Sequence, residues 1–215
     1  MRILRHCFST LLFSLILCVK SHAVLTVDDS DPHFESFVIQ ELNNMRDGKR
    51  GIVCQILIQR IDESSSTTTI KPLTQDENTW HPNDRKGTRS HVVALDTKVR
   101  GANRNNPTSV ILYIHPSRVD PNLSLFKTGS LARELAEAMD LNRGQFSGDY
   151  KIQEKRENFF RNAWRDSLGL SLISMSGRVP TDEFQEAKKK GLIEKKYADQ
   201  FPILFPDQVM PIETP

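Results

Sequence analysis

Apolar side chains recur at helical spacing in four parts of the chain, and short β-branched runs lie between them. The spacing predicts helices over residues 34–46, 130–141, 152–167 and 181–191. Strands are expected at 70–73, 91–96 and 109–114. The apolar run at 51–58 follows a glycine and fits either a strand or a continuation of the buried segment before it. Because a helix comes first, then strands, then helices, we expect an α+β fold with a small β-sheet packed against helices.

The first residues have the pattern of a targeting signal. Arg2 and Arg5 precede an apolar stretch over residues 8–19, and Ser-His-Ala at 21–23 has the small-x-small pattern of a cleavage site. A membrane anchor is the competing interpretation, but the stretch is shorter than the roughly 20 residues that a spanning helix needs. We therefore expect residues 1–23 to be a cleaved signal peptide and the mature protein to be periplasmic or secreted.

The composition of the mature chain excludes some classes of partner. Removal of residues 1–23 leaves 26 of the 29 lysines and arginines against 27 acids, so the clustered positive charge of a nucleic-acid-binding protein is not expected. Cys54 is the one cysteine left, which rules out an internal disulfide. No second long apolar segment follows, so no membrane association is expected after cleavage. We expect a single domain over 24–200 and a proline-rich tail over 201–215.

The predicted helix at 130–141 contains the segment Leu-Ala-Arg-Glu-Leu-Ala-Glu-Ala-Met-Asp at 131–140. A zinc-binding helix often carries His-Glu-x-x-His, because two imidazoles four residues apart share a face and the glutamate beside them activates the metal-bound water. Arg133 and Glu137 stand at the two histidine positions here, whereas Glu134 keeps the place of the general base. The segment therefore resembles a zinc helix that has lost both histidines.

Two flanking segments extend this likeness. Ile-His-Pro at 114–116 ends a predicted strand before the helix, and three residues follow the helix at matching spacings: Asn162, Arg165 and Gly169. Together these segments resemble the secreted effector zinc metallopeptidases of bacteria, the NleD-type family. The resemblance implies a zincin-like active-site helix followed by a second, ligand-bearing helix, with Glu154 at the third ligand position and structural support from the three matching residues. Arg161 departs from the family, which has a glutamate before the asparagine.

The substitutions change what such a site can bind. A guanidinium group has no lone pair to offer a metal and is always charged, so Arg133 at a ligand position repels a divalent cation. We expect that zinc is lost, that no cofactor replaces it, and that Arg133 pairs with the carboxylates of Glu137 and Glu154. The alternative is a solvated helix face, on which each ion pair contributes only about a few tenths of a kcal/mol.

The function expected from the resemblance is that of an exported metallopeptidase-like pseudoenzyme, a virulence-related secreted factor that binds a protein or peptide without cleaving it. One alternative is a small exported α+β interaction protein unrelated to peptidases, in which Glu134, Glu137 and Glu154 point away from one another. A second alternative is an active hydrolase with an atypical site around Glu134. A conventional metal or cysteine site is not expected, because no two histidines of the mature chain have His-x-x-x-His spacing and Cys54 lies in an apolar run.

Overall fold

The computed structural model describes residues 25–73, 90–96, 106–173 and 183–194. The predicted signal peptide and the proline-rich tail lie outside these ranges, so both stay predictions. In the described ranges, no helix combines the length and the apolar character needed to cross a membrane.

Four strands form one mixed sheet in the described part of the chain. They are β1 (Leu25–Val27), β2 (Thr68–Pro72), β3 (His91–Ala94) and β4 (Val110–Ile114). Their order across the sheet is β1-β2-β4-β3. β1, β2 and β4 are parallel, and β3 lies at the edge, antiparallel to β4. β1 was not predicted, because three residues directly after the expected cleavage site are too short for a periodic signal.

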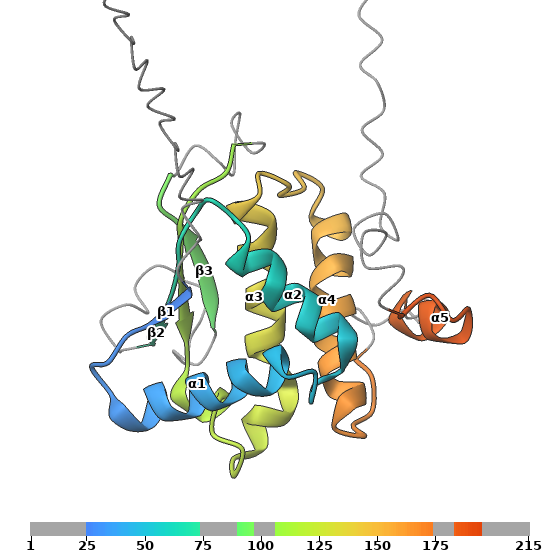
Figure 1. Ribbon diagram of the computed structural model, residues 1–215, viewed down its shortest axis with the longest axis horizontal. Coiled ribbons are helices and arrows are strands. Elements are labelled where there is room, and N and C mark those ends of the chain that lie inside the picture. Colours follow the sequence, from blue (N-terminus) through green and yellow to red (C-terminus); the bar gives the residue numbers. More distant parts are fainter. Residues whose placement is uncertain (1–24, 74–89, 97–105, 174–182, 195–215) are drawn as a thin grey trace, which may run out of the picture.

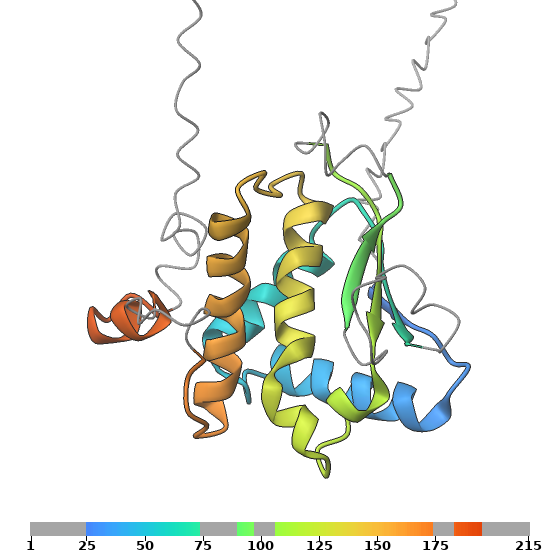
Figure 2. The same cartoon turned by 180° about the vertical axis from the view of Figure 1, so that it is seen from behind.

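Five helices accompany the sheet in the same ranges. They are α1 (Pro32–Arg46), α2 (Gly51–Asp62), α3 (Ser130–Asn142), α4 (Tyr150–Ser167) and α5 (Glu183–Lys189). α3 packs against β3 and β4, and α2 and α4 pack against α3 (Figure 1). Seen from behind, α3 stands between the sheet and α4 (Figure 2). The architecture is thus α+β with a small sheet backed by helices, as expected.

Local sequence signals place most of these elements. Asp31 caps α1 by accepting hydrogen bonds from the backbone N–H groups of His33 and Phe34, and a proline opens the helix. The helices predicted at 34–46, 130–141 and 152–167 and the three predicted strands are confirmed to within a few residues. α5 lies inside the helix predicted at 181–191, whose expected first residues are outside the described ranges.

Residues 51–58 are helical, which rules out a strand there. They belong to α2, a helix with buried residues around most of its circumference, including Val53, Ile56 and Ile58. α2 contacts α1, α3 and α4, so apolar side chains are needed on several sides and no clear helical stripe appears in the sequence. The β-branched composition of this segment was therefore a weak indication of a strand, because tertiary packing can override the intrinsic preference of residues for strand or helix.

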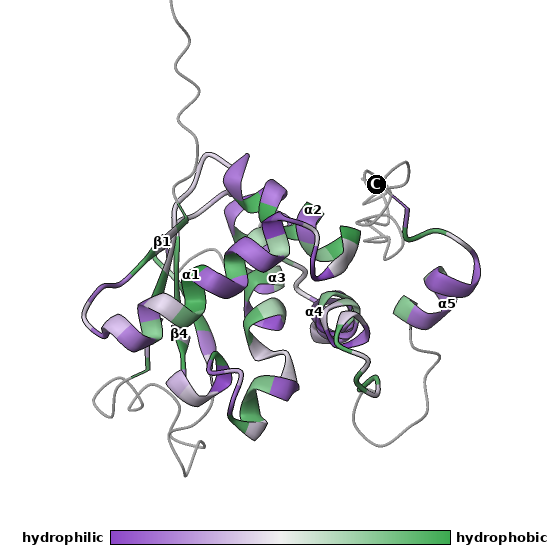
Figure 3. Ribbon diagram, turned by 60° about the horizontal axis from the view of Figure 1, so that its bottom comes forward, coloured by the Kyte–Doolittle hydropathy of each residue, from purple (hydrophilic) through white to green (hydrophobic). Residues whose placement is uncertain are grey.

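The core lies between the sheet and the helices. On β4, Val110, Leu112 and Ile114 alternate with half-buried residues and point into the core, as the period of two requires. Figure 3 shows hydrophobic residues along β4 and on parts of α2 and α3, and α3 contacts both of the other elements. This packing holds α3 rigidly against the edge strand β3, and that contact positions the candidate site.

Candidate functional site

The candidate site begins at the first turn of α3. Gly129 adopts a left-handed conformation (φ 69°) between a short 3-10 helix, Ser124–Thr128, and the first residue of α3. The opposite face of α3 is anchored in the core by Leu131 and Leu135. The helix consequently presents Arg133, Glu134 and Glu137 toward α4 and β3.

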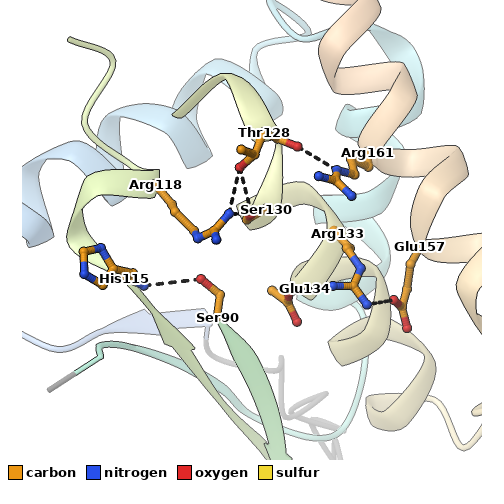
Figure 4. Close-up of polar contacts among 9 residues, drawn as sticks. All are labelled: Ser90, His115, Arg118, Thr128, Ser130, Arg133, Glu134, Glu157 and Arg161. Carbon is orange, nitrogen blue, oxygen red and sulfur yellow. Dashed lines mark hydrogen bonds and ion pairs between the residues drawn. The ribbon is translucent and has the colours of Figure 1, made fainter. Parts of the chain in front are cut away.

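Arg133 joins α3 to α4 through an ion pair. Its Nη2 lies 2.7 Å from Oε2 of Glu157, and its Nη1 lies 3.4 Å from Oε1 of Glu134 (Figure 4). The side chains of Glu134 and Glu157 are only 4% and 6% exposed, and that of Arg133 is 25% exposed. These residues therefore do not form a solvated helix face. Arg133 links two buried carboxyl groups.

Glu157, and not Glu154, is the glutamate of α4 in this arrangement. Two neighbouring cavities lie beside Arg133, a larger one of about 340 Å³ and a smaller one of about 150 Å³. Glu154 is half-buried and lines neither of them, whereas Glu157 bonds with Arg133 and lines the larger one. Arg133 therefore pairs with Glu157 in place of the expected Glu154. Glu137 is half-buried, lines the larger cavity, and its charge helps to raise the pKa of Arg133.

Burial controls the electrostatics of the two carboxyl groups. Loss of solvation raises the pKa of Glu134 to about 7, and the positive charge of Arg133 opposes that rise. Burial likewise raises the pKa of Glu157, against the opposing effect of the same arginine. A carboxyl group with a pKa near neutrality can gain or lose a proton at physiological pH, and Glu134 is such a group.

A cavity of about 340 Å³ adjoins this ion pair. On one side lies the start of the edge strand, with Ser90, His91 and Val92, and on the other lie the charged residues of α3 and Glu157 of α4. The loop between α3 and α4 completes the wall with Phe146, Ser147 and Gly148, and α4 adds its first residue, Tyr150. The hollow is therefore bounded by a sheet edge, a charged helix face and an aromatic loop.

The residues present do not fit a catalytic zinc ion. Zinc needs neutral histidine or carboxylate ligands and an open position for water, whereas the residue that the resemblance would place as the first ligand is Arg133, whose guanidinium group has no lone pair to offer. Within the described ranges, no group of three histidine, cysteine, aspartate or glutamate side chains converges with the geometry of a metal site.

A second polar cluster ties α3 to α4 beside the larger cavity, which its member Gln153 also lines. Asp140 of α3, 3% exposed, accepts hydrogen bonds from Gln153 (3.1 Å) and Arg156 (3.4 Å) of α4. Arg156 also donates to the backbone oxygen of Gln145, in the loop between the two helices, at 2.7 Å. This cluster fixes the rotation of α4 relative to α3, and that rotation brings Glu157 opposite Arg133.

The three residues carried over as structural support contact the chain after α4. Asn162 bonds with both backbone groups of Ile173, and Arg165 donates to the backbone oxygens of Ser171 and Lys127. Gly169 has a φ of 66° at the end of α4, where the chain turns back. These contacts hold the end of α4 close to the segment that leads into α3.

Cys54 and His115 are not part of the site. Cys54 is fully buried in α2, and burial raises the pKa of its thiol, so a nucleophilic role is not supported. His115 follows β4, and its Nδ1 is 2.6 Å from Oγ of Ser117 in a local turn. Burial lowers the pKa of His115, which favours the neutral ring.

Sequence reasoning gave no site role to four residues around the site: Ser90, Arg118, Glu157 and Arg161. Arg161 was noticed as a departure from the resemblance, but Ser90 and Arg118 lie far from it in the sequence and were not connected with it. The apolar spacing of α4 contained no clear signal for Glu157, because this glutamate is itself buried, three residues before the buried Phe160 on the same side of the helix.

Comparisons with known proteins add no assignment. The chain matches no protein-family model, and the comparisons found no significant similarity to a curated protein or to a solved structure.

Proposed function

We propose that the protein is an exported, metallopeptidase-like pseudoenzyme that binds an extended peptide beside β3 without cleaving it. In this proposal α3 corresponds to the active-site helix of a zincin-like fold, and α4 corresponds to the second helix. The observation that carries the proposal is the position of Arg133. It pairs with Glu157 and Glu134 where a zinc ligand would be, and it does so beside a sheet edge.

The edge strand supports the binding part of the proposal. β3 is the last strand of the described sheet, and its neighbour within that sheet is β4. His91 and Val92 of β3 line the larger cavity together with Arg133 and Glu134, so a peptide in this cavity would lie beside the strand and over both charged side chains.

The ion pair supports the loss of cleavage. Hydrolysis of an amide by a zincin requires a metal-bound water, and Arg133 supplies neither a ligand nor space for the ion. Glu134 keeps the position of a general base, but its carboxyl group is buried against Arg133. A positive charge that is held in place can still bind a carbonyl oxygen or a carboxylate of a peptide.

Selection from a displayed library of random peptides tests the proposal. Tyr150→Ala should weaken the binding of selected peptides about tenfold or more, since Tyr150 is 69% exposed and lines the cavity. Leu123→Ala, a change at an exposed apolar residue outside the cavity walls, is the matched control.

Two results would overturn the proposal. One is that selected peptides bind the Tyr150→Ala protein as tightly as they bind the unchanged protein. The other is that the purified protein binds one equivalent of zinc and cleaves peptides, which would establish the active hydrolase instead. Metal content by mass spectrometry and peptide turnover by chromatography measure the second result directly.

A further inference from the structure

A second, smaller cavity lies on the other side of Arg133. Its volume is about 150 Å³, and its walls are three arginines, two serines and one acid: Arg118, Arg133, Arg161, Ser90, Ser130 and Glu134. We call it the arginine pocket. It shares Ser90, Arg133 and Glu134 with the larger cavity, so the two hollows are neighbours.

The three guanidinium groups are held in place by separate contacts (Figure 4). Arg118 donates through Nη1 to the hydroxyl groups of Thr128 (3.1 Å) and Ser130 (2.7 Å). Arg161 donates through Nε to the backbone oxygen of Thr128 at 2.6 Å. Arg133 is fixed by its ion pair with Glu157. The arginines come from three different elements and are oriented before any ligand arrives.

Positive charge is in excess at this pocket. Glu134 is the one acid among its walls, and burial raises the pKa of that carboxyl group to about 7, so its negative charge is incomplete at neutral pH. Within the described ranges, no carboxylate lies within ion-pair distance of Arg161. Burial and the charges of Arg133 and Arg165 lower the pKa of Arg161 to about 10.

The chemistry of the walls selects the class of ligand. Arginine side chains bind the oxygens of carboxylate and phosphate groups through two parallel N–H donors, and serine hydroxyls add further donors. Ser130 is the first residue of α3, where the positive end of the helix dipole favours an anion. Gly129 before it supplies no side-chain cap to this helix end.

We propose that the arginine pocket binds an oxyanion, a carboxylate or a phosphate or sulfate group, between Arg118, Arg133 and Arg161. The anion would lie among three guanidinium groups that line one cavity, and its negative charge would offset the repulsion between them. This site is independent of the proposed peptide binding, because it requires only the walls of the smaller cavity.

The first test is titration of the purified protein with three probes at constant ionic strength. Sodium phosphate, sodium acetate and the dipeptide acetyl-Ala-Ala with a free carboxylate are each followed by calorimetry, and the amidated dipeptide is the uncharged control. At least one anion should bind and raise the melting temperature. Binding of phosphate alone identifies a phosphoryl or sulfuryl source, and binding of the free acid over the amide identifies a carboxylate.

Two variants connect binding with the pocket. Arg161→Gln should lower the affinity for the anion about tenfold or more, because the substitution removes one charged donor. Arg143→Gln, a change at an exposed arginine near the far end of α3, should leave the affinity within about twofold. If Arg161→Gln does not fold, the Nε–H signals of Arg118 and Arg161 in the unchanged protein report binding by nuclear magnetic resonance.

Three results would overturn the proposal. These are the absence of binding for all probes, equal affinity of the unchanged and Arg161→Gln proteins, and equal binding of the acid and amide dipeptides without phosphate binding. Failure of peptide selection leaves these outcomes unaffected, so the two proposals can fail separately.

Discussion

At the scale of single residues, the balance between burial and charge around Arg133 decides the character of the site. Two carboxyl groups are almost fully removed from water, and one guanidinium group lies between them. Breaking a buried ion pair is costly because the remaining charge has no solvent to stabilise it. The effect of a substitution here should therefore depend on pH.

Arg133→Met should destabilise the protein more at pH 8 than at pH 5. At the higher pH, Glu134 and Glu157 would be left charged and close together, at a cost of about 2 kcal/mol after allowance for the partial exposure of the arginine. At pH 5, Glu134 is protonated because its pKa is about 7, the raised pKa of Glu157 favours protonation of that group as well, and the loss should shrink. Urea unfolding at the two pH values measures this, with Arg143→Met as control. A loss of equal size at both would contradict it.

Glu134→Gln should remove part of the pH dependence of stability. The pKa of Glu134 is about 7 in the folded protein against 4.5 ordinarily, so folding favours the protonated form. Protonation of Glu134 therefore stabilises the folded protein fully below pH 4.5, and this contribution is lost as pH rises through 7. The free energy of unfolding falls by up to about 1.4 kcal/mol per pH unit over this range. The stability of the variant relative to the unchanged protein should therefore increase between pH 5 and pH 8.

The control for this series is Glu63→Gln, at an exposed position that ends α2. Asp140, whose pKa burial raises to about 7, titrates in both proteins and cancels in the difference. A difference that stays constant with pH would show that Glu134 is not protonated preferentially in the folded state.

At the scale of elements, a buried polar cluster joins α1, α2 and α4. Glu41 of α1 is 4% exposed and accepts hydrogen bonds from Arg50 (2.6 and 2.8 Å) and from the indole N–H of Trp164 (2.6 Å). The guanidinium of Arg50 also lies 5.9 Å from the centre of the Trp164 ring. Trp164 in turn packs edge-on against Phe126, just before α3. The cluster therefore anchors both helices of the site to the first half of the chain.

Glu41→Ala should lower the free energy of unfolding by about 3 kcal/mol, because Arg50 and Trp164 would lose their shared acceptor inside the protein. Chemical denaturation followed by tryptophan fluorescence measures the change. Gln40→Ala, at the exposed neighbouring position of α1, should change it by less than about 0.5 kcal/mol. Similar losses in both variants would mean that the cluster contributes little beyond helix propensity.

At the scale of the whole molecule, export is a prediction of the N-terminal sequence alone. Expression of the full chain in a bacterium with a general secretion pathway should yield a mature protein that begins at Val24, in the periplasm or medium. Mass spectrometry of the purified protein identifies the first residue. Ala23→Arg should block cleavage, because the position before the cut needs a small side chain. An intact N-terminus in the unchanged chain would exclude the signal peptide.

The helices α2 and α4 differ in how much of their structure could be predicted from the sequence. The bounds of α4 followed from its periodicity, but the count along the motif pointed to Glu154 in place of Glu157. Three residues shift a helical position by about 4.5 Å along the axis and by about 60° around it. Which glutamate meets Arg133 is set by the rotation of α4, and the contacts of Asp140 with Gln153 and Arg156 fix that rotation. In α2, neighbours on several sides hid the helical period.

The order of amino acids by itself determined the helices with one apolar face and the α+β class. These features depend on residues a few positions apart in the sequence, whose local interactions are the same whatever the tertiary structure. Only the tertiary structure decided that Arg133 meets Glu157, that β3 lies at the edge beside it, and that Arg118 and Arg161 face one pocket. Those contacts join segments tens of residues apart, and long-range packing alone brings them together.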